Sequence, residues 1–194
     1  RAVGISSNWS RAEFTSTSSA ARATIKSMQY VVLGADGMLG SDLVAICMAR
    51  DLPILGLDFP AIDITDSTTL DSAIPEGSTV VNCAAYTQVD DAETDRERAF
   101  LVNASGAGNV AQVCLRKGCR LLHLSTDYVF NGSADQPCRE EDPTGPLNVY
   151  GESKLAGELE VRDAGCDALV VRAQSLFGAN GKNFGHTIMN RLSE

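Results

Sequence analysis

The sequence lacks long apolar runs, clustered basic residues and paired cysteines. No stretch of 18 apolar residues occurs in its 194 residues, so no membrane-spanning helix is expected. Lysine and arginine number 16 against 25 acidic residues, and this net charge of −9 argues against sequence-independent binding to nucleic acid. None of the six cysteines forms a CxxC pair, so a zinc site is not expected. Most of them lie in apolar segments, which indicates reduced thiols and a cytoplasmic location.

The first 27 residues differ in composition from the rest. They are rich in Ser, Thr, Ala and Arg, carry a single acid (Glu13), and show no sustained helical or strand period. We predict a disordered tail or leader over residues 1–27; the alternative is an Arg/Ser-rich transit peptide. A secretory signal peptide does not fit, because no apolar core segment is present. We expect the ordered domain to span residues 28–194.

From Gln29 onward, short apolar strands alternate with helical patterns. The predicted strands are Tyr30–Leu33, Ile54–Leu57, Thr79–Cys83, Arg120–Ser125 and Ala168–Arg172. The predicted helices are Leu39–Arg50, Asp95–Lys117, Val149–Ala164 and Gly185–Leu192. Such alternation predicts an α/β fold with a doubly wound parallel sheet of the Rossmann type. Ligands then bind beyond the carboxyl ends of the strands.

A glycine-rich turn, GADGMLG, follows the first strand and opens the first helix. Gly34 permits the tight turn, Gly37 leaves room for a pyrophosphate at the backbone, and Gly40 permits close packing of helix and strand. The N-terminus of the helix favours a diphosphate. Three glycines alone are common in turns, but this position between strand and helix predicts dinucleotide binding.

An acidic residue, Asp58, ends the second strand 18 residues past Gly40. A carboxylate there accepts hydrogen bonds from the adenosine ribose and repels a 2′-phosphate, which favours NADH. The alternative is a turn-forming aspartate before Pro60. Asp63 and Ile64, in the following loop, are expected beside the adenine.

A tyrosine and a lysine, Tyr150 and Lys154, stand four residues apart on one predicted helix face. A nearby ammonium lowers the pKa of a phenol and has spare donors for the nicotinamide ribose. Thr126, at the carboxyl end of the fourth strand, is placed to hold a substrate carbonyl oxygen, although a turn-forming role is the alternative. The three residues together predict redox chemistry between a carbonyl and an alcohol.

Four motifs in order, GADGMLG, VVNCAAYTQVDDAE, HLSTDYVFNG and PLNVYGESKLAGE, resemble the dTDP-4-dehydrorhamnose reductases of the extended short-chain dehydrogenase/reductase group. The resemblance runs from about Met28 to Asn190. It implies a catalytic set, diphosphate contacts, adenosine contacts, residues flanking the cofactor, and substrate contacts. The implied catalytic set is Thr126, Tyr150 and Lys154, and the implied substrate contacts are Thr126 and Asp127. The implied diphosphate contacts are Gly37, Met38 and Leu39, and the implied adenosine contacts are Asp58, Asp63 and Ile64. The residues expected to flank the cofactor are Ala85, Tyr86 and Thr87. Asn103 matches an asparagine that supports the active site in the wider group; a packing role is the equal alternative.

The activity implied by this resemblance is reduction of the 4-keto group of dTDP-4-dehydro-L-rhamnose to dTDP-L-rhamnose by NADPH or NADH, with tyrosine as proton donor. A homodimer is possible, and no nucleic-acid or membrane partner is expected. Mg²⁺ is possible in the family, but the acidic run at residues 140–142 is better explained as a solvated loop, so no metal site is predicted. The alternatives are a non-enzymatic NADP-binding regulatory subunit of the methionine adenosyltransferase type, or another nucleotide-sugar epimerase or dehydratase.

Two features depart from the family pattern. Ser175 stands where relatives usually have a Trp, so the stacking surface for the sugar nucleotide is expected to be missing or moved to Phe177. The chain is also shorter than family members and is expected to be truncated at its C-terminus, with most of the substrate-binding part missing.

Overall fold

The computed structural model describes residues 5–6, 29–133, 135–178, 180–181 and 183–192. Apart from residues 5 and 6, the predicted tail lies outside the described part of the chain. Those two residues form a short strand, β1 (Ile5–Ser6), where we expected no regular structure. It pairs antiparallel with the last strand of the sheet, with Ile5 opposite Val171. This pairing satisfies backbone groups that would otherwise be open at a sheet edge.

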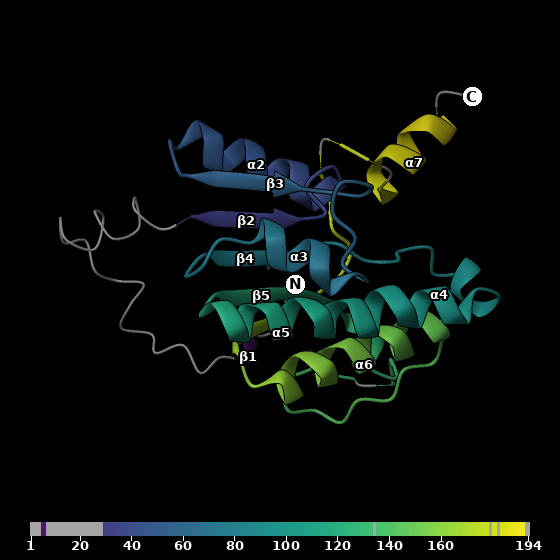
Figure 1. Cartoon of the computed structure of the whole chain (residues 1–194). Coiled ribbons are helices and arrows are strands. Elements are labelled where there is room, and N and C mark those ends of the chain that lie inside the picture. The colour runs from purple at the N-terminus through teal and green to yellow at the C-terminus, as the bar shows by residue number, and fades with distance from the viewer. Residues whose placement is uncertain (1–4, 7–28, 134, 179, 182, 193–194) are drawn as a thin grey trace.

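The remaining strands form the predicted parallel sheet (Figure 1). They are β2 (Tyr30–Leu33), β3 (Ile54–Leu57), β4 (Thr79–Asn82), β5 (Arg120–Thr126) and β6 (Asp167–Ala173). Their order is β1-β6-β5-β4-β2-β3, so the chain reverses its winding direction between β2 and β4. In a doubly wound sheet this reversal opens a crevice at the carboxyl ends of the strands.

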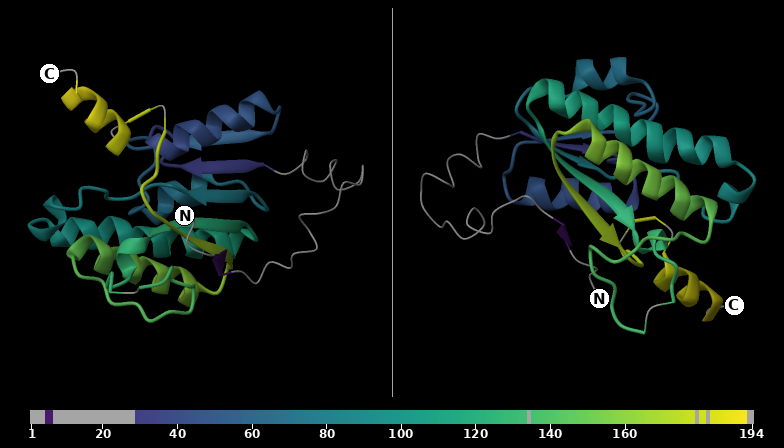
Figure 2. Two further views of the ribbon diagram at one scale, coloured as in Figure 1. Left: turned by 180° about the vertical axis from the view of Figure 1, so that it is seen from behind. Right: turned by 90° about the horizontal axis from the view of Figure 1, so that it is seen from below.

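Helices cover both faces of the sheet (Figure 2). One face carries α3 (Ser67–Ala73), α5 (Ala107–Lys117) and α6 (Val149–Ala164), and the opposite face carries α2 (Met38–Ala49). The main core lies between the first face and its helices, built from Val31, Leu33, Leu70, Val80, Val110, Val113, Leu121 and Val161. Every residue of β6 keeps some exposure, so this end of the sheet is covered less than the central strands β2, β4 and β5.

The predicted start of the helix at Val149 and the predicted helix end at Lys117 are both observed, and a cap stands next to each. The side chain of Asn148 accepts a hydrogen bond from the backbone N–H of Gly151 at 2.7 Å and so caps α6. Gly118 ends α5 in the left-handed conformation, with φ of 60°. The start of α6 decides where Tyr150 and Lys154 point, so this cap helps to place both.

The predicted helix over Asp95–Lys117 is interrupted. It consists of α4 (Arg96–Phe100), a π-helical segment η2 (Leu101–Gly106) and α5. Apolar periodicity does not distinguish these states, because a π turn adds a residue without ending the helix. The short helix α3 also went unpredicted, since its seven mostly polar residues show no apolar stripe; Asp66 caps it through the N–H of Thr68.

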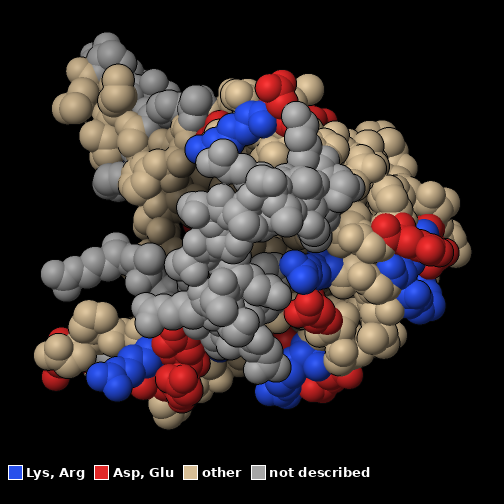
Figure 3. Space-filling model, turned by 90° about the vertical axis from the view of Figure 1, so that its left-hand side faces the viewer, with Lys and Arg blue, Asp and Glu red and all other residues tan. Residues whose placement is uncertain are grey.

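Three shorter pieces complete the described fold: two 3₁₀ turns, η1 (Asp91–Glu93) and η3 (Asp127–Val129), and a terminal helix α7 (Phe184–Leu192). α7 projects from the end of the sheet where the strands have their carboxyl ends (Figure 1). On the face drawn in Figure 3, basic side chains lie next to acidic ones across the described surface.

Candidate active site

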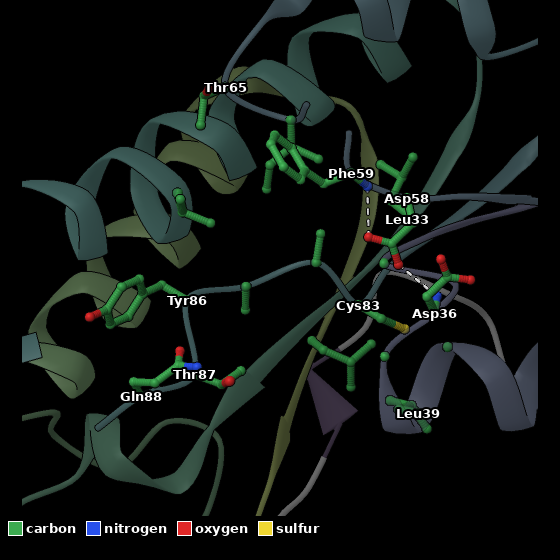
Figure 4. A pocket seen from close by; sticks show the side chains of 18 of the residues that line it. Leu33, Asp36, Leu39, Asp58, Phe59, Thr65, Cys83, Tyr86, Thr87 and Gln88 are labelled. Atoms are coloured by element: carbon green, nitrogen blue, oxygen red, sulfur yellow. Dashed lines mark hydrogen bonds between the residues drawn. The ribbon is translucent and has the colours of Figure 1, made fainter. Parts of the chain in front are cut away.

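A cleft of about 1520 Å³ opens at the carboxyl ends of the strands. All of the residues predicted to bind a cofactor line it: Gly34, Gly37, Met38, Leu39, Gly40, Asp58, Asp63, Ile64, Ala85, Tyr86, Thr87, Tyr150 and Lys154. Part of this lining is drawn in Figure 4. The structure thus brings the glycine-rich turn and the tyrosine–lysine pair to one cavity, as the sequence predicted.

The glycine-rich turn is shaped by two glycines. Gly34 adopts φ of +78°, which side chains other than glycine rarely tolerate. A Cβ added to Gly40 would stand 2.0 Å from the carbonyl oxygen of Gly34, so α2 approaches the turn too closely for any side chain. No side chain in the described part of the chain caps α2, whose N-cap is Gly37. The first N–H groups of this helix therefore face the cleft without a side-chain acceptor.

Asp58 braces this turn. Its Oδ2 accepts a hydrogen bond from the backbone N–H of Asp36 at 2.6 Å, and its Oδ1 accepts one from Phe59 at 2.7 Å (Figure 4). The carboxylate is therefore part of the cleft wall and is held in place before any ligand arrives. Phe59 also lines the cleft, with 69% of its surface exposed, and sequence reasoning missed it.

The loop after β3 is shaped by its own side chains. Oδ1 of Asp63 accepts hydrogen bonds from the N–H and the hydroxyl of Thr65, at 2.8 and 2.7 Å. The side-chain amide of Asn109 donates to the carbonyl oxygens of Ile64 and Thr65, both at 3.1 Å. These bonds hold Asp63 and Ile64 at the cleft wall.

The segment after β4 is held by Asn103 from the π-helical segment. The Asn103 amide accepts from the N–H of Tyr86 at 2.9 Å and donates to the carbonyl of Tyr86 at 3.0 Å. It also donates to the hydroxyl of Ser153 on α6 at 2.9 Å. Asn103 thereby ties the Tyr86 wall to the helix that carries Tyr150.

Lys154 is buried, with 3% of its surface exposed, and its Nζ donates to the carbonyl oxygen of Leu124 at 2.6 Å. Burial lowers the pKa of Lys154 to about 8, whereas the carboxylate of Glu158 acts in the opposite direction. Burial also raises the pKa of Tyr150, and a hydrogen bond with Thr126 opposes that rise. We expected the lysine to lower the pKa of the phenol; instead, desolvation dominates and keeps the phenol protonated at neutral pH.

Thr126 lies beside Tyr150 but not on the cleft lining. Its hydroxyl donates to Oδ1 of Asp127 at 3.2 Å and accepts from the N–H of Tyr128 at 3.3 Å. The ring of Tyr128 stands edge-on to Tyr150, with the ring centres 5.7 Å apart. Neither Thr126 nor Asp127 lines the cleft, so the predicted substrate contacts are next to the cavity and not in its wall.

The segment after β6 reaches the cleft through Leu176. Ser175, where relatives usually carry Trp, is exposed and has φ of 47°. The ring of Phe177, the predicted substitute, is 64% exposed and does not line the cleft. Leu176 is therefore the side chain from this segment that borders the cavity.

The acidic loop residues gather no metal-binding set. Asp142 accepts a hydrogen bond from the N–H of Arg139 at 2.7 Å, and no group of three or more metal-ligating side chains occurs among the residues that the structure describes. Within the same residues, no helix is both long and apolar enough to cross a membrane.

Comparison with known proteins gives consistent matches. The family model described as the RmlD substrate binding domain matches residues 28–194. A dTDP-4-dehydrorhamnose reductase from Mycolicibacterium smegmatis is 43% identical over 89% of this chain and 53% of its own length. A dTDP-4-keto-6-deoxy-D-glucose reductase from Streptomyces niveus is 42% identical over 80% of this chain and 55% of its own length. The chain thus spans about half the length of these curated relatives.

Among solved structures, a dTDP-4-dehydrorhamnose reductase from Bacillus anthracis in complex with NADP matches with a TM-score of 0.80 and 35% identity. The match covers 84% of this chain and 59% of that one. An enzyme from Bordetella bronchiseptica in complex with NAD matches with a TM-score of 0.65 and 26% identity, covering 73% of this chain and 51% of that one.

Proposed function

This chain belongs to the family of the RmlD substrate binding domain, and we propose on that premise that it serves in the reduction of a 4-keto group on a dTDP-deoxysugar by NADPH or NADH. Residues 28–194 form its cofactor-binding domain in this proposal. The observation that carries it is the shared cleft, in which Tyr150 and Lys154 line the same cavity as the glycine-rich turn and Asp58. The substrate class follows from relatives named for reduction of dTDP-4-dehydrorhamnose and dTDP-4-keto-6-deoxy-D-glucose.

The residues fit a nicotinamide dinucleotide. The start of α2 has uncapped N–H groups beside a turn that excludes side chains, which suits a diphosphate. Asp58 offers carboxylate lone pairs to ribose hydroxyls, and Phe59 and Ile64 add apolar surface on the same wall. Lys154 has donors left beyond the bond to Leu124, and these suit the second ribose.

The proposed chemistry assigns one step to each residue. A bound reduced nicotinamide supplies the hydride. Tyr150, kept neutral by burial, gives its phenol proton to the oxygen of the developing alcohol. Lys154 holds ribose hydroxyls and stabilises the phenolate that remains. Thr126, which is hydrogen-bonded to Tyr150, orients the phenol. Contact of Thr126 and Asp127 with the substrate oxygen is part of the proposal, although neither residue lines the cleft.

Cofactor binding is the first test, and it uses the chain as it is. NADH and NADPH are titrated into the protein while nicotinamide fluorescence is followed, for the unaltered chain and for Tyr150→Phe and Lys154→Met. We expect saturable binding by the unaltered chain, nearly unchanged binding by Tyr150→Phe and weaker binding by Lys154→Met. Absence of binding by the unaltered, folded chain would contradict the proposal.

Turnover is the second test. Oxidation of NADPH is measured with dTDP-4-dehydrorhamnose, for the chain alone and for a fusion to the part of the Mycolicibacterium smegmatis relative that the match does not cover. We expect oxidation that needs the keto sugar and is abolished by Tyr150→Phe. Binding of the cofactor without turnover in the fusion would instead favour a non-enzymatic cofactor-binding subunit.

A further inference from the structure

A buried carboxylate lies one helical turn behind Lys154. Glu158, on α6, is 8% exposed, although an unpaired carboxylate is seldom buried. Its Oε1 accepts a hydrogen bond from the hydroxyl of Ser125 at 2.5 Å and another from Nε of Arg172 at 2.9 Å. Its Oε2 accepts one from Nη2 of Arg172 at 2.6 Å. The carboxylate thus joins α6 to the neighbouring strands β5 and β6.

We propose that Glu158 is a positioning residue for the reaction proposed above, a carboxylate that keeps Lys154 charged and holds the end of β5 in place. The inference rests on the proposed function, because the charge of Lys154 affects the reaction only if a cofactor binds in the cleft. Glu158 does not line the cleft and acts through its neighbours.

Several ionisable groups surround Lys154 and bear on its charge. The groups that interact with its amine are Cys83 after β4, His123 on β5 and Glu158 on its own helix. Tyr150 stands four residues before Lys154 on the same helix. Burial raises the pKa of the Cys83 thiol to about 11 and holds the pKa of His123 well below its usual value, so both are neutral near pH 7. Tyr150 is neutral as well, since burial raises its pKa.

Glu158 is consequently the ionised partner that counters the desolvation of Lys154. Burial alone would drive the amine towards its uncharged form, and the carboxylate opposes this. An uncharged Lys154 would lose one donor and would no longer stabilise a phenolate at Tyr150. The position of Glu158, four residues past Lys154, keeps both groups on one face of α6.

Arg172 holds this carboxylate in one orientation. Its guanidinium pairs with both oxygens of Glu158, donates through Nη1 to the carbonyl of Glu140 at 3.2 Å, and lies over the ring of Phe130 at 4.9 Å. With Arg172 in place, Glu158 has a fixed oxygen for the hydroxyl of Ser125, the residue directly before Thr126. The strand end that carries Thr126 is therefore tied to the helix that carries Tyr150.

The test is a titration of Lys154 in the unaltered protein and in Glu158→Gln, which keeps the shape of the side chain and removes its charge. The sequence contains only four lysines, so the ¹³Cε resonance of Lys154 is assignable in protein labelled with ¹³C-lysine. We expect its titration midpoint to fall by about one pH unit in Glu158→Gln. The affinity for NADPH should fall about fivefold near pH 8, where the charged fraction of Lys154 drops from about one half to about one tenth, and change little near pH 6.

Glu152→Gln is the matched control. Glu152 lies on the same helix and pairs with Arg96 at 2.7 Å, but this pair is at the surface. Its removal should leave both the midpoint of Lys154 and the pH dependence of binding unchanged. An equal shift in Glu152→Gln would overturn the proposal, because a general loss of charge on α6 would explain it.

The remaining outcomes separate this inference from the function on which it rests. A folded Glu158→Gln with an unshifted Lys154 midpoint overturns the inference, whatever the cofactor does. If the unaltered protein binds no cofactor at any pH, the proposed function fails, while the resonance of Lys154 still decides whether Glu158 controls its charge. If Glu158→Gln does not fold, the double variant Glu158→Met/Arg172→Met removes the pair without leaving a lone buried charge. A downward shift smaller than that in Glu158→Gln is expected there, because loss of the Arg172 cation offsets part of the lost negative charge, and absence of any shift overturns the proposal.

Discussion

The contact between Gly40 and Gly34 permits a quantitative prediction for the substitution Gly40→Ala. The new Cβ would stand 2.0 Å from the carbonyl oxygen of Gly34 and 2.9 Å from Cα of Ala35. A carbon–oxygen contact needs about 3.3 Å, so the turn or the helix must move by about 1.3 Å. All of the atoms in the way belong to backbone or to Cα, and no flexible side-chain end can swing aside.

Two energetic effects oppose each other in this variant. Overpacking costs about 1–3 kcal/mol, and alanine favours the helix by up to about 1 kcal/mol relative to glycine. We expect a net loss of about 1–2 kcal/mol, which corresponds to a fall in Tm of about 2–8 °C for a chain of this size. Because the displaced atoms form the cradle for the diphosphate, cofactor affinity should fall at least about tenfold.

Gly108→Ala, also a helical glycine, is the control. A Cβ there would meet Oε2 of Glu160 at 3.2 Å, which can move, and Cβ of Glu160 at 3.3 Å, a contact that a shift of a few tenths of an ångström relieves. The control should be neutral or slightly stabilising, with unchanged affinity for the cofactor. Thermal unfolding and fluorescence titration of the two variants check the argument. If Gly40→Ala were as stable as the control and bound the cofactor as well as the unaltered chain, the steric reasoning would be refuted.

Three further predictions concern charge. The carboxylate of Asp58 should make NADH bind at least about fivefold more tightly than NADPH, and Asp58→Asn should bring the two Kd values together in fluorescence titrations; tighter binding of NADPH to the unaltered chain would contradict this. Because burial holds the pKa of His123 well below 6.5, the unfolded chain takes up a proton that the folded chain does not, so stability should be lost as the pH falls below about 6.5. Urea unfolding at about pH 7 and about pH 5 measures this loss, which His123→Gln should reduce. Arg172→Met should destabilise the fold by about 3–5 kcal/mol, because it leaves Glu158 buried without its cation. In the same urea experiment the surface substitution Arg162→Met should have little effect.

The sheet could be predicted from local sequence because its strands are short apolar runs that end at distinctive residues. Tyr30–Leu33 ends at Gly34 and Ile54–Leu57 ends at Asp58, and in both cases the predicted bounds are those observed. The polar residues that follow parallel strands come to the same edge of the sheet, which is why the predicted cofactor residues share one cleft.

What could not be predicted depends on contacts between distant segments. The raised pKa of Tyr150 and the bond from Lys154 to the carbonyl of Leu124 arise from burial that the spacing of two residues does not reveal. The role of Glu158 is hidden for the same reason, since its partners Ser125 and Arg172 are far from it in sequence. A carboxylate one turn past the lysine and an arginine on the last strand were the available signals.

The π-helical segment η2 (Leu101–Gly106) determines in which directions the side chains of α4 and α5 point relative to each other. Residues before it, such as Ala99, pack near Tyr86 and Tyr150, whereas residues after it, such as Val110, pack on the sheet. Each residue of an α-helix turns the side chains by about 100°, so a regular helix of the same length could not serve both surfaces at once. Deletion of one residue here would turn either the side chains of α4 away from the wall of the cavity or those of α5 away from the hydrophobic core.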